Sequence, residues 1–118
     1  MINGINSREM ILEILLEIEE GEHSHVAIRN ALSKYQFLPK QDRAFITRVC
    51  EGTLEYRIQI DYIINSFSKV TVDKMKPAIR EILRSAVYQL KYMDSVPDSA
   101  VCNEAVKLAQ RKGFYNLK

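Results

Sequence analysis

Residues 76–93 carry the pattern that most restricts the fold of this chain. Their apolar side chains recur at steps of three and four, which is the repeat of one face of an α-helix. This stripe consists of Ile79, Ile82, Leu83, Ala86, Val87, Leu90 and Met93. Pro77 suits a first helical turn, where its missing N–H costs nothing, and Thr71 or Asp73 can cap the helix before it. The pattern predicts a central helix with an apolar face toward the core.

The basic residues of the same stretch fall off the stripe. They are Lys76, Arg80, Arg84 and Lys91, with Tyr88 beside them. A helix of this kind is expected to bury its apolar face and to turn a basic flank outward.

Composition extends this expectation to the whole chain. Its 118 residues suffice for one domain whose single core needs no metal or disulfide. Only four Gly and three Pro interrupt the chain, and alternating Val, Ile and Thr runs with hairpin turns are absent. We therefore expect an all-α bundle of about five to seven helices joined by short loops.

Further helices begin and end at local signals. The predicted starts are Asn6, Ser24, Pro39 and Asp98 or Ser99, and the predicted stops are Gly21 and Gly113. The run 39–68 is too long for one typical helix, so we expect a bend near residues 56–59. Gly52 lies inside this run at a cost of about 1 kcal/mol relative to Ala, which indicates close approach of another helix.

Charge is unevenly distributed. Residues 1–25 hold one basic and six acidic side chains, whereas residues 26–118 hold the other 16 basic and nine acidic ones. A basic body is compatible with a polyanionic partner, although a solvated helical face looks similar. Cys50 and Cys102 lack metal-ligand spacing and are interpreted as small buried residues in a reducing compartment. His23 and His25 are a weak metal signal on their own, so no metal site is predicted. Without a signal peptide or membrane span, the protein is expected in the cytoplasm, away from membranes.

Several groups of residues occur in the order typical of the NusB family. They are Asp42-Arg43, Gly52, residues 60–64 (IDYII), 82–90 (ILRSAVYQL), Val96-Pro97 and 103–109 (NEAVKLA), and Arg8-Glu9 also fits. The chain therefore resembles this family over nearly its whole length. The resemblance implies an all-helical, RNA-binding fold, found both in stand-alone antitermination factors and in the N-terminal domain of rRNA 5-methylcytosine methyltransferases.

Three features favour the methyltransferase branch. The antitermination factors are arginine-rich at the N-terminus, whereas the matching helix here is acidic and keeps only Arg8. Residues 38–57 (LPKQDRAFITRVCEGTLEYR), followed shortly by DYII at 61–64, also look more like the methyltransferase N-terminal domain. The family as a whole normally continues with a further helix, so Phe114, Tyr115 and Leu117 after a helix stop indicate that the chain is an N-terminal fragment. The resemblance then implies rRNA as a partner and a catalytic domain in cis that binds S-adenosylmethionine. The alternative is an antitermination factor that binds box A RNA with ribosomal protein S10.

The basic side chains are the candidate RNA contacts, because each phosphate neutralised releases counterions. They are Arg8, Arg43, Arg48, Arg57, Arg80, Arg84 and Lys91. Each also has a structural interpretation: Arg43 is unfavourable in a first helical turn and should have a partner elsewhere, and Arg84 can form a salt bridge. Tyr88 either stacks on a base or packs against a helix. No acid/base pair, nucleophile with a histidine, or phosphate loop is present, so this chain carries no predicted catalytic site. A helical domain that binds only proteins is the third possibility.

Overall fold

The computed structural model describes residues 6–113, and the regular secondary structure in that range is entirely helical. Its elements are α1 (Ser7–Glu19), α2 (Ser24–Lys34), α3 (Lys40–Glu55), α4 (Arg57–Phe67), the 3₁₀ turn η2 (Val72–Lys74), α5 (Pro77–Tyr92) and α6 (Asp98–Arg111). The predicted all-α bundle is confirmed. The residues on which the fragment interpretation depends, Phe114, Tyr115 and Leu117, lie outside the described range.

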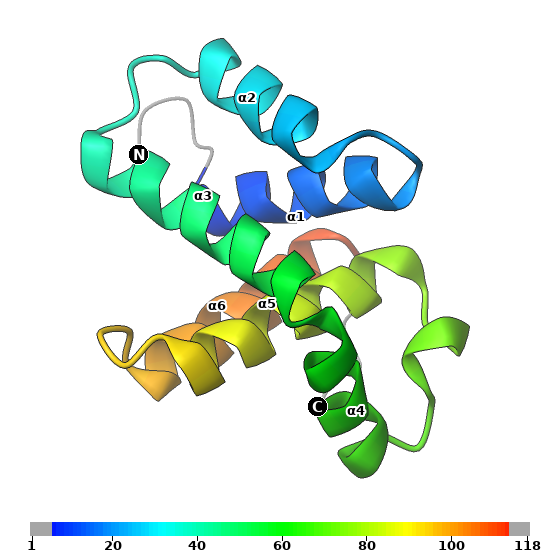
Figure 1. Ribbon diagram of the computed structural model, residues 1–118. Coiled ribbons are helices and arrows are strands. Elements are labelled where there is room, and N and C mark those ends of the chain that lie inside the picture. Colours follow the sequence, from blue (N-terminus) through cyan, green and yellow to red (C-terminus); the bar gives the residue numbers. More distant parts are fainter. Residues whose placement is uncertain (1–5, 114–118) are drawn as a thin grey trace.

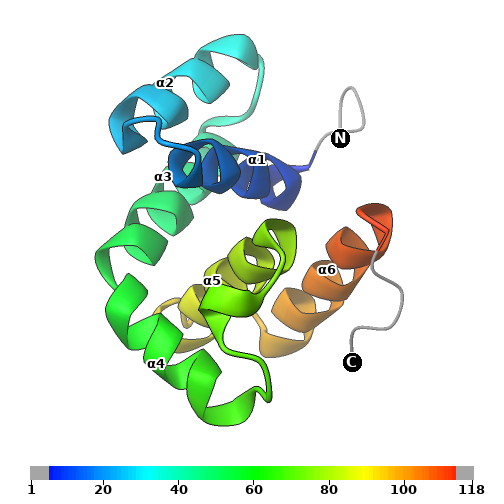
Figure 2. The same ribbon diagram turned by 90° about the vertical axis from the view of Figure 1, so that its right-hand side faces the viewer.

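Helix α5 lies at the centre of the arrangement and packs against α1, α3, α4 and α6 (Figures 1 and 2). The main apolar cluster joins α1, α2, α3 and α4 to it, and a second cluster lies between α1, α5 and α6. Residues of α5 belong to both clusters. The stretch that carries the strongest helical pattern is therefore a helix that packs against four others.

Burial around α5 is wider than its stripe predicted. Most stripe residues are buried or half-buried, but Leu90 is 39% exposed. Tyr88, Gln89 and Glu81, which fall off the stripe, are almost completely buried. The prediction that the basic flank faces outward is wrong for Arg80 and Arg84, whose side chains are 14% and 11% exposed. Because helices surround α5 on several sides, its polar positions also lie inside the protein.

The local signals at the helix ends are partly confirmed. Asn6 Oδ1 accepts a hydrogen bond from the backbone N–H of Glu9 at 2.8 Å, as expected of an N-cap. Ser24 and Asp98 are instead the first residues of α2 and α6, and the cap positions belong to His23 and Pro97. Thr71 and Asp73 are separated from α5 because η2 intervenes.

Glycines mark the helix stops as predicted. Gly21 and Gly113 have φ of +119° and +90°, in the left-handed region that favours glycine after a helix. The expected bend is also present, since α3 ends at Glu55 and α4 begins at Arg57. Tyr56 lies between them.

The cysteines differ in their surroundings. Cys50 is fully buried, and burial raises its pKa far above the ordinary value. Cys102 is exposed on α6, so the prediction that it is buried is wrong. No helix among residues 6–113 is long and apolar enough to cross a membrane.

Candidate nucleic-acid interface

The crossing of α3 over α5 depends on Gly52. A Cβ atom at this position would overlap the Tyr88 ring, with Cζ, Cε1 and Oη as its nearest neighbours. The predicted close approach at this glycine is therefore confirmed, and the approaching group is an aromatic ring of α5. Tyr88 is 5% exposed, so packing, and not base stacking, is its role in this structure.

Three tyrosines stack at the same junction. The Tyr56 and Tyr92 ring centroids lie 4.4 Å apart, and those of Tyr88 and Tyr92 lie 5.3 Å apart. The Tyr92 hydroxyl donates a hydrogen bond to Gln59 Oε1 on α4. The stack thus connects the α3–α4 bend to the C-terminal end of α5.

A groove of about 550 Å³ runs along the outward face of α3. Its lining residues are Lys40, Arg43, Ala44, Thr47, Arg48, Glu51, Gly52, Glu55 and Tyr88. Ala44, Thr47 and Gly52 have small side chains or none, which leaves space between the longer charged ones. The groove therefore offers both cations and carboxylates to a bound molecule.

Exposed cations lie at the groove, beside the tyrosine stack and at the start of α4. Exposed Arg48 donates from Nη2 to the backbone oxygen of Tyr92 at 3.3 Å, and Lys91 Nζ lies 5.6 Å from the Tyr92 ring centroid. Arg57 is exposed at the start of α4, where it borders a small pocket together with Glu19 and Glu81 and does not line the groove. None of the three forms a salt bridge within residues 6–113. Their charge is available to an anionic partner.

Arg43 lines the same groove but serves the fold. Its Nη1 donates to the backbone oxygens of Leu32 at 2.9 Å and Tyr35 at 3.3 Å. These carbonyls belong to the C-terminal end of α2, where helical partners are missing. The partner predicted for Arg43 is thus the end of the neighbouring helix.

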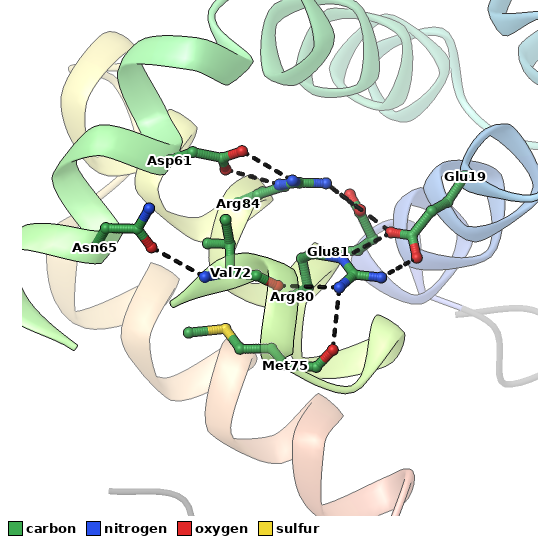
Figure 3. Close-up of polar contacts among 8 residues, drawn as sticks. All are labelled: Glu19, Asp61, Asn65, Val72, Met75, Arg80, Glu81 and Arg84. Carbon is green, nitrogen blue, oxygen red and sulfur yellow. Dashed lines mark hydrogen bonds and ion pairs between the residues drawn. The ribbon is translucent and has the colours of Figure 1, made fainter. Parts of the chain in front are cut away.

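Arg84 is surrounded by carboxylates from three helices (Figure 3). Its Nε and Nη2 donate to the two oxygens of Asp61 on α4, both at 2.8 Å, in a bidentate pair. Its Nη1 donates to Glu81 Oε2 at 2.7 Å and lies 3.9 Å from Glu19 of α1. The predicted structural salt bridge of Arg84 is confirmed.

Arg80 joins α1 to the segment before α5, as Figure 3 also shows. It forms a salt bridge with Glu19, and its Nη1 donates to the backbone oxygens of Val72 and Met75, each at 3.0 Å. Asn65 Oδ1 accepts a hydrogen bond from the Val72 N–H at 2.9 Å on the other side of η2. Both arginines of α5 therefore hold the helices together.

This network contains three carboxyl groups and only two guanidinium groups. Burial and the neighbouring Glu19 raise the pKa of Glu81 to about 8, against the opposing effect of Arg84. The hydrogen bond from Arg80 lowers the pKa of Glu19 to about 2. Two of the three carboxyl groups are therefore ionised and paired with the arginines, and the buried one, Glu81, carries a proton.

Arg8 also turns inward. Its Nε donates to Gln89 Oε1 at 3.2 Å, and its guanidinium carbon lies 5.2 Å from the Phe45 ring centroid. Burial lowers the pKa of Arg8, and the charge of Glu104 partly opposes this. The residue that best matched the arginine-rich N-terminus of the antitermination factors is thus packed into the α1–α3–α5 junction.

The seven predicted RNA contacts fall into two sets. Arg8, Arg43, Arg80 and Arg84 hold helices together, whereas Arg48, Arg57 and Lys91 are exposed. RNA contact by any of them stays a prediction. Sequence reasoning missed Lys40, Glu51 and Glu55 as groove residues. They recur with Ala44 and Arg48 at steps of three and four, and this spacing could have shown that all five lie on one face of α3.

Comparison with known proteins places the chain in a family. The NusB family model matches residues 5–117. The chain is 31% identical over 110 residues to the probable ribosomal RNA small subunit methyltransferase B of Bacillus subtilis, covering 93% of this chain and 24% of that protein. It is also 31% identical over 106 residues to the transcription antitermination protein NusB of Acetivibrio thermocellus, covering 88% of this chain and 72% of that protein. The chain thus spans about a quarter of the methyltransferase relative and most of the antitermination one.

The fold agrees with this result. A crystal structure of the antitermination factors NusB and NusE in complex with double-stranded RNA superposes with a TM-score of 0.82. The identity is 17%, and the match covers 92% of this chain and 81% of that one. With a family model that matches nearly every residue and the same helical architecture, this chain belongs to the NusB family.

Proposed function

We propose that this chain is an RNA-binding domain that contacts RNA along the groove of α3. The observation that carries the proposal is the group of exposed cations, Arg48, Arg57 and Lys91, which no carboxylate neutralises within residues 6–113. Because no salt bridge has to break first, these cations can turn toward phosphates at little cost. The solved NusB–NusE complex with RNA supports an RNA ligand for this fold.

The chemistry of the groove suits an unpaired nucleotide. Its volume of about 550 Å³ lies within the range of small-ligand sites, roughly 300–1,000 Å³. Arg48 is placed to meet a phosphate, and the Glu51 and Glu55 carboxylates can accept hydrogen bonds from exocyclic amino groups of bases. Double-stranded RNA would meet the rim only, because its bases are not accessible to such a groove.

The RNA in this proposal is small-subunit rRNA, presented to a cytosine-5 methyltransferase domain in the same polypeptide. The 31% identical methyltransferase relative, matched over 93% of this chain, supports this branch. A second methyltransferase B relative, from Synechocystis, is 33% identical over 96% of the chain. The acidic face of α1 supports it too, because Glu13, Glu17 and Glu20 are exposed there and would repel RNA. S-adenosylmethionine would belong to the catalytic domain.

RNA binding is tested by fluorescence anisotropy with a labelled small-subunit rRNA hairpin over a salt series. The Arg48→Ala/Arg57→Ala double variant should bind about tenfold more weakly, and the slope of its salt dependence should fall by about 1 for each phosphate that the variant no longer neutralises. Lys107→Ala/Arg111→Ala is the matched control, because it also removes two exposed positive charges, both on α6. Equal affinity and salt dependence in the double variant would refute the groove as the RNA site.

An antitermination factor is the second candidate. Its support is the NusB relative whose length this chain covers to 72%, together with the NusB–NusE complex. The reading frame separates the two candidates: several hundred further codons favour the methyltransferase, and a stop after one more helix favours antitermination. In the second case, ribosomal protein S10 should raise the affinity for box A RNA in the same anisotropy assay.

A further inference from the structure

Helix α4 turns an uncharged face to solvent. Seven of its eleven residues are exposed, and Arg57 is the only charged one among them. Ile58 and Tyr62, one helical turn apart, are 87% and 76% exposed. A chain in which 27% of residues are charged normally covers an outward helix face with charges, as α1 does with Glu13 and Glu17.

The end of α4 adds a second apolar element. Phe67 follows Ile60 and Ile64 at steps of four and three, so it continues the inward stripe of the helix. Ile60 and Ile64 are 0% and 6% exposed, but Phe67 is 88% exposed, and Val70 just beyond it is 48% exposed. The apolar stripe of α4 therefore extends past the core that covers its first two turns.

We propose that the exposed apolar residues of α4, with Ile58 and Tyr62 on its outward face and Phe67 at its C-terminal end, form the docking surface for a protein domain in the same polypeptide. The inference rests on the methyltransferase branch of the proposed function. A charge-depleted surface with exposed aromatics is typical of the centre of a protein interface, whereas an RNA site needs cations for phosphates. The methyltransferase relatives support an occupant in cis, because this chain matches only 24% and 25% of their lengths.

The position of α4 connects the two surfaces. Gln59, on the exposed side of α4, accepts the hydrogen bond of the Tyr92 hydroxyl at the tyrosine stack. Arg48 reaches the backbone oxygen of the same Tyr92. RNA held along the α3 groove would therefore lie next to a domain docked on α4, which is the arrangement that presenting a nucleotide to a catalytic domain requires.

The test uses the full-length protein encoded by the parent reading frame. The photoreactive substitution Tyr62→benzoylphenylalanine should cross-link to peptides of the downstream domain, identified by mass spectrometry. Amide hydrogen exchange in α4 should be slower by roughly tenfold or more in the full-length protein than in residues 1–118. Cross-links to a second copy, to RNA or to another protein, or unchanged exchange in α4, would overturn the proposal.

A charge-insertion variant adds a matched control. Tyr62→Glu should abolish the slower exchange of α4 in the full-length protein, while Val106→Glu, at a 44% exposed residue of α6, should leave it unchanged. Circular dichroism of both variants in residues 1–118 checks that each folds. If Arg48→Ala/Arg57→Ala weakens RNA binding but α4 is not covered, only the docking proposal fails. A reading frame without a downstream domain overturns the docking proposal and the methyltransferase branch, but not RNA binding.

Discussion

Gly52→Ala is the substitution whose outcome depends most directly on the geometry of the α3–α5 crossing. By helix propensity alone, Ala should stabilise the middle of α3 by about 1 kcal/mol. The new methyl group would overlap the ring of Tyr88, however, and Tyr88 is 5% exposed and stacked 5.3 Å from Tyr92. The ring cannot move without displacing the tyrosine stack, so overpacking should cost about 3 kcal/mol. We expect a net loss of about 2 kcal/mol.

The assay is urea unfolding followed by far-ultraviolet circular dichroism. Gly52→Ala should lower the free energy of unfolding by that amount, with Tm lower by roughly 6–10 °C for a chain of this size. In a Tyr88→Leu background the ring is absent, so Gly52→Ala should become neutral or stabilising by up to about 1 kcal/mol. The reasoning is refuted if Gly52→Ala alone is as stable as the wild type, or if the sign is the same in both backgrounds.

Three further predictions concern the charged groups. Arg84→Ala leaves Asp61 and Glu81 without their shared cation, so it should lower the free energy of unfolding in urea by about 3–5 kcal/mol. Exposed Arg57→Ala should change it by about 0.5 kcal/mol or less. Equal effects of the two substitutions would contradict a structural role for Arg84. Folding raises the pKa of Glu81 from 4.5 to about 8. The stability that the protonated Glu81 carboxyl contributes is therefore fully present below pH 4.5 and is lost as pH rises through 8. Stability should therefore fall by on the order of 2–3 kcal/mol between about pH 5 and pH 8, and Glu81→Gln should flatten this profile; an unchanged slope would argue against a protonated Glu81. Arg43→Ala removes the hydrogen-bond donor to the backbone oxygens of Leu32 and Tyr35 and should lower the free energy of unfolding by about 1–3 kcal/mol. Amide hydrogen exchange should become faster in α2 but not in α6. An equal increase in both helices would contradict a local role of Arg43 at the end of α2.

Local signals predicted most of the secondary structure. The Asn6 cap, the left-handed glycines and the α3–α4 bend at Tyr56 each depend on a few neighbouring residues, so they could be read directly from the chain. The cap positions of α2 and α6 were misplaced by one residue, because Ser24 and Asp98 are equally suited to a first helical turn. Gly52 showed that something must approach α3, although Tyr88 as the approaching group came from the structure.

The candidate site was less predictable, because its residues are selected by partners distant in sequence. Arg80 pairs with Glu19, 61 positions away, and Arg84 pairs with Asp61, 23 positions away, whereas Arg48 and Arg57 meet no carboxylate within the described range. These arginines are indistinguishable by residue type and helical periodicity. The family resemblance was carried by motifs that turned out to be largely packing residues, such as Tyr88 and Gln89.

The sequence by itself determined an all-helical chain with 76–93 as its central helix, because hydrophobic periodicity and turn chemistry act over a few residues. The resemblance to the NusB family came separately, from the order of its motifs. Only the tertiary structure decided which sides of that helix are buried and which cations remain available. A helix surrounded by four others has no simple outward flank, so Arg80 and Arg84 became internal ion pairs. Burial and charge pairing depend on the whole arrangement of helices, and no short stretch of sequence contains that information.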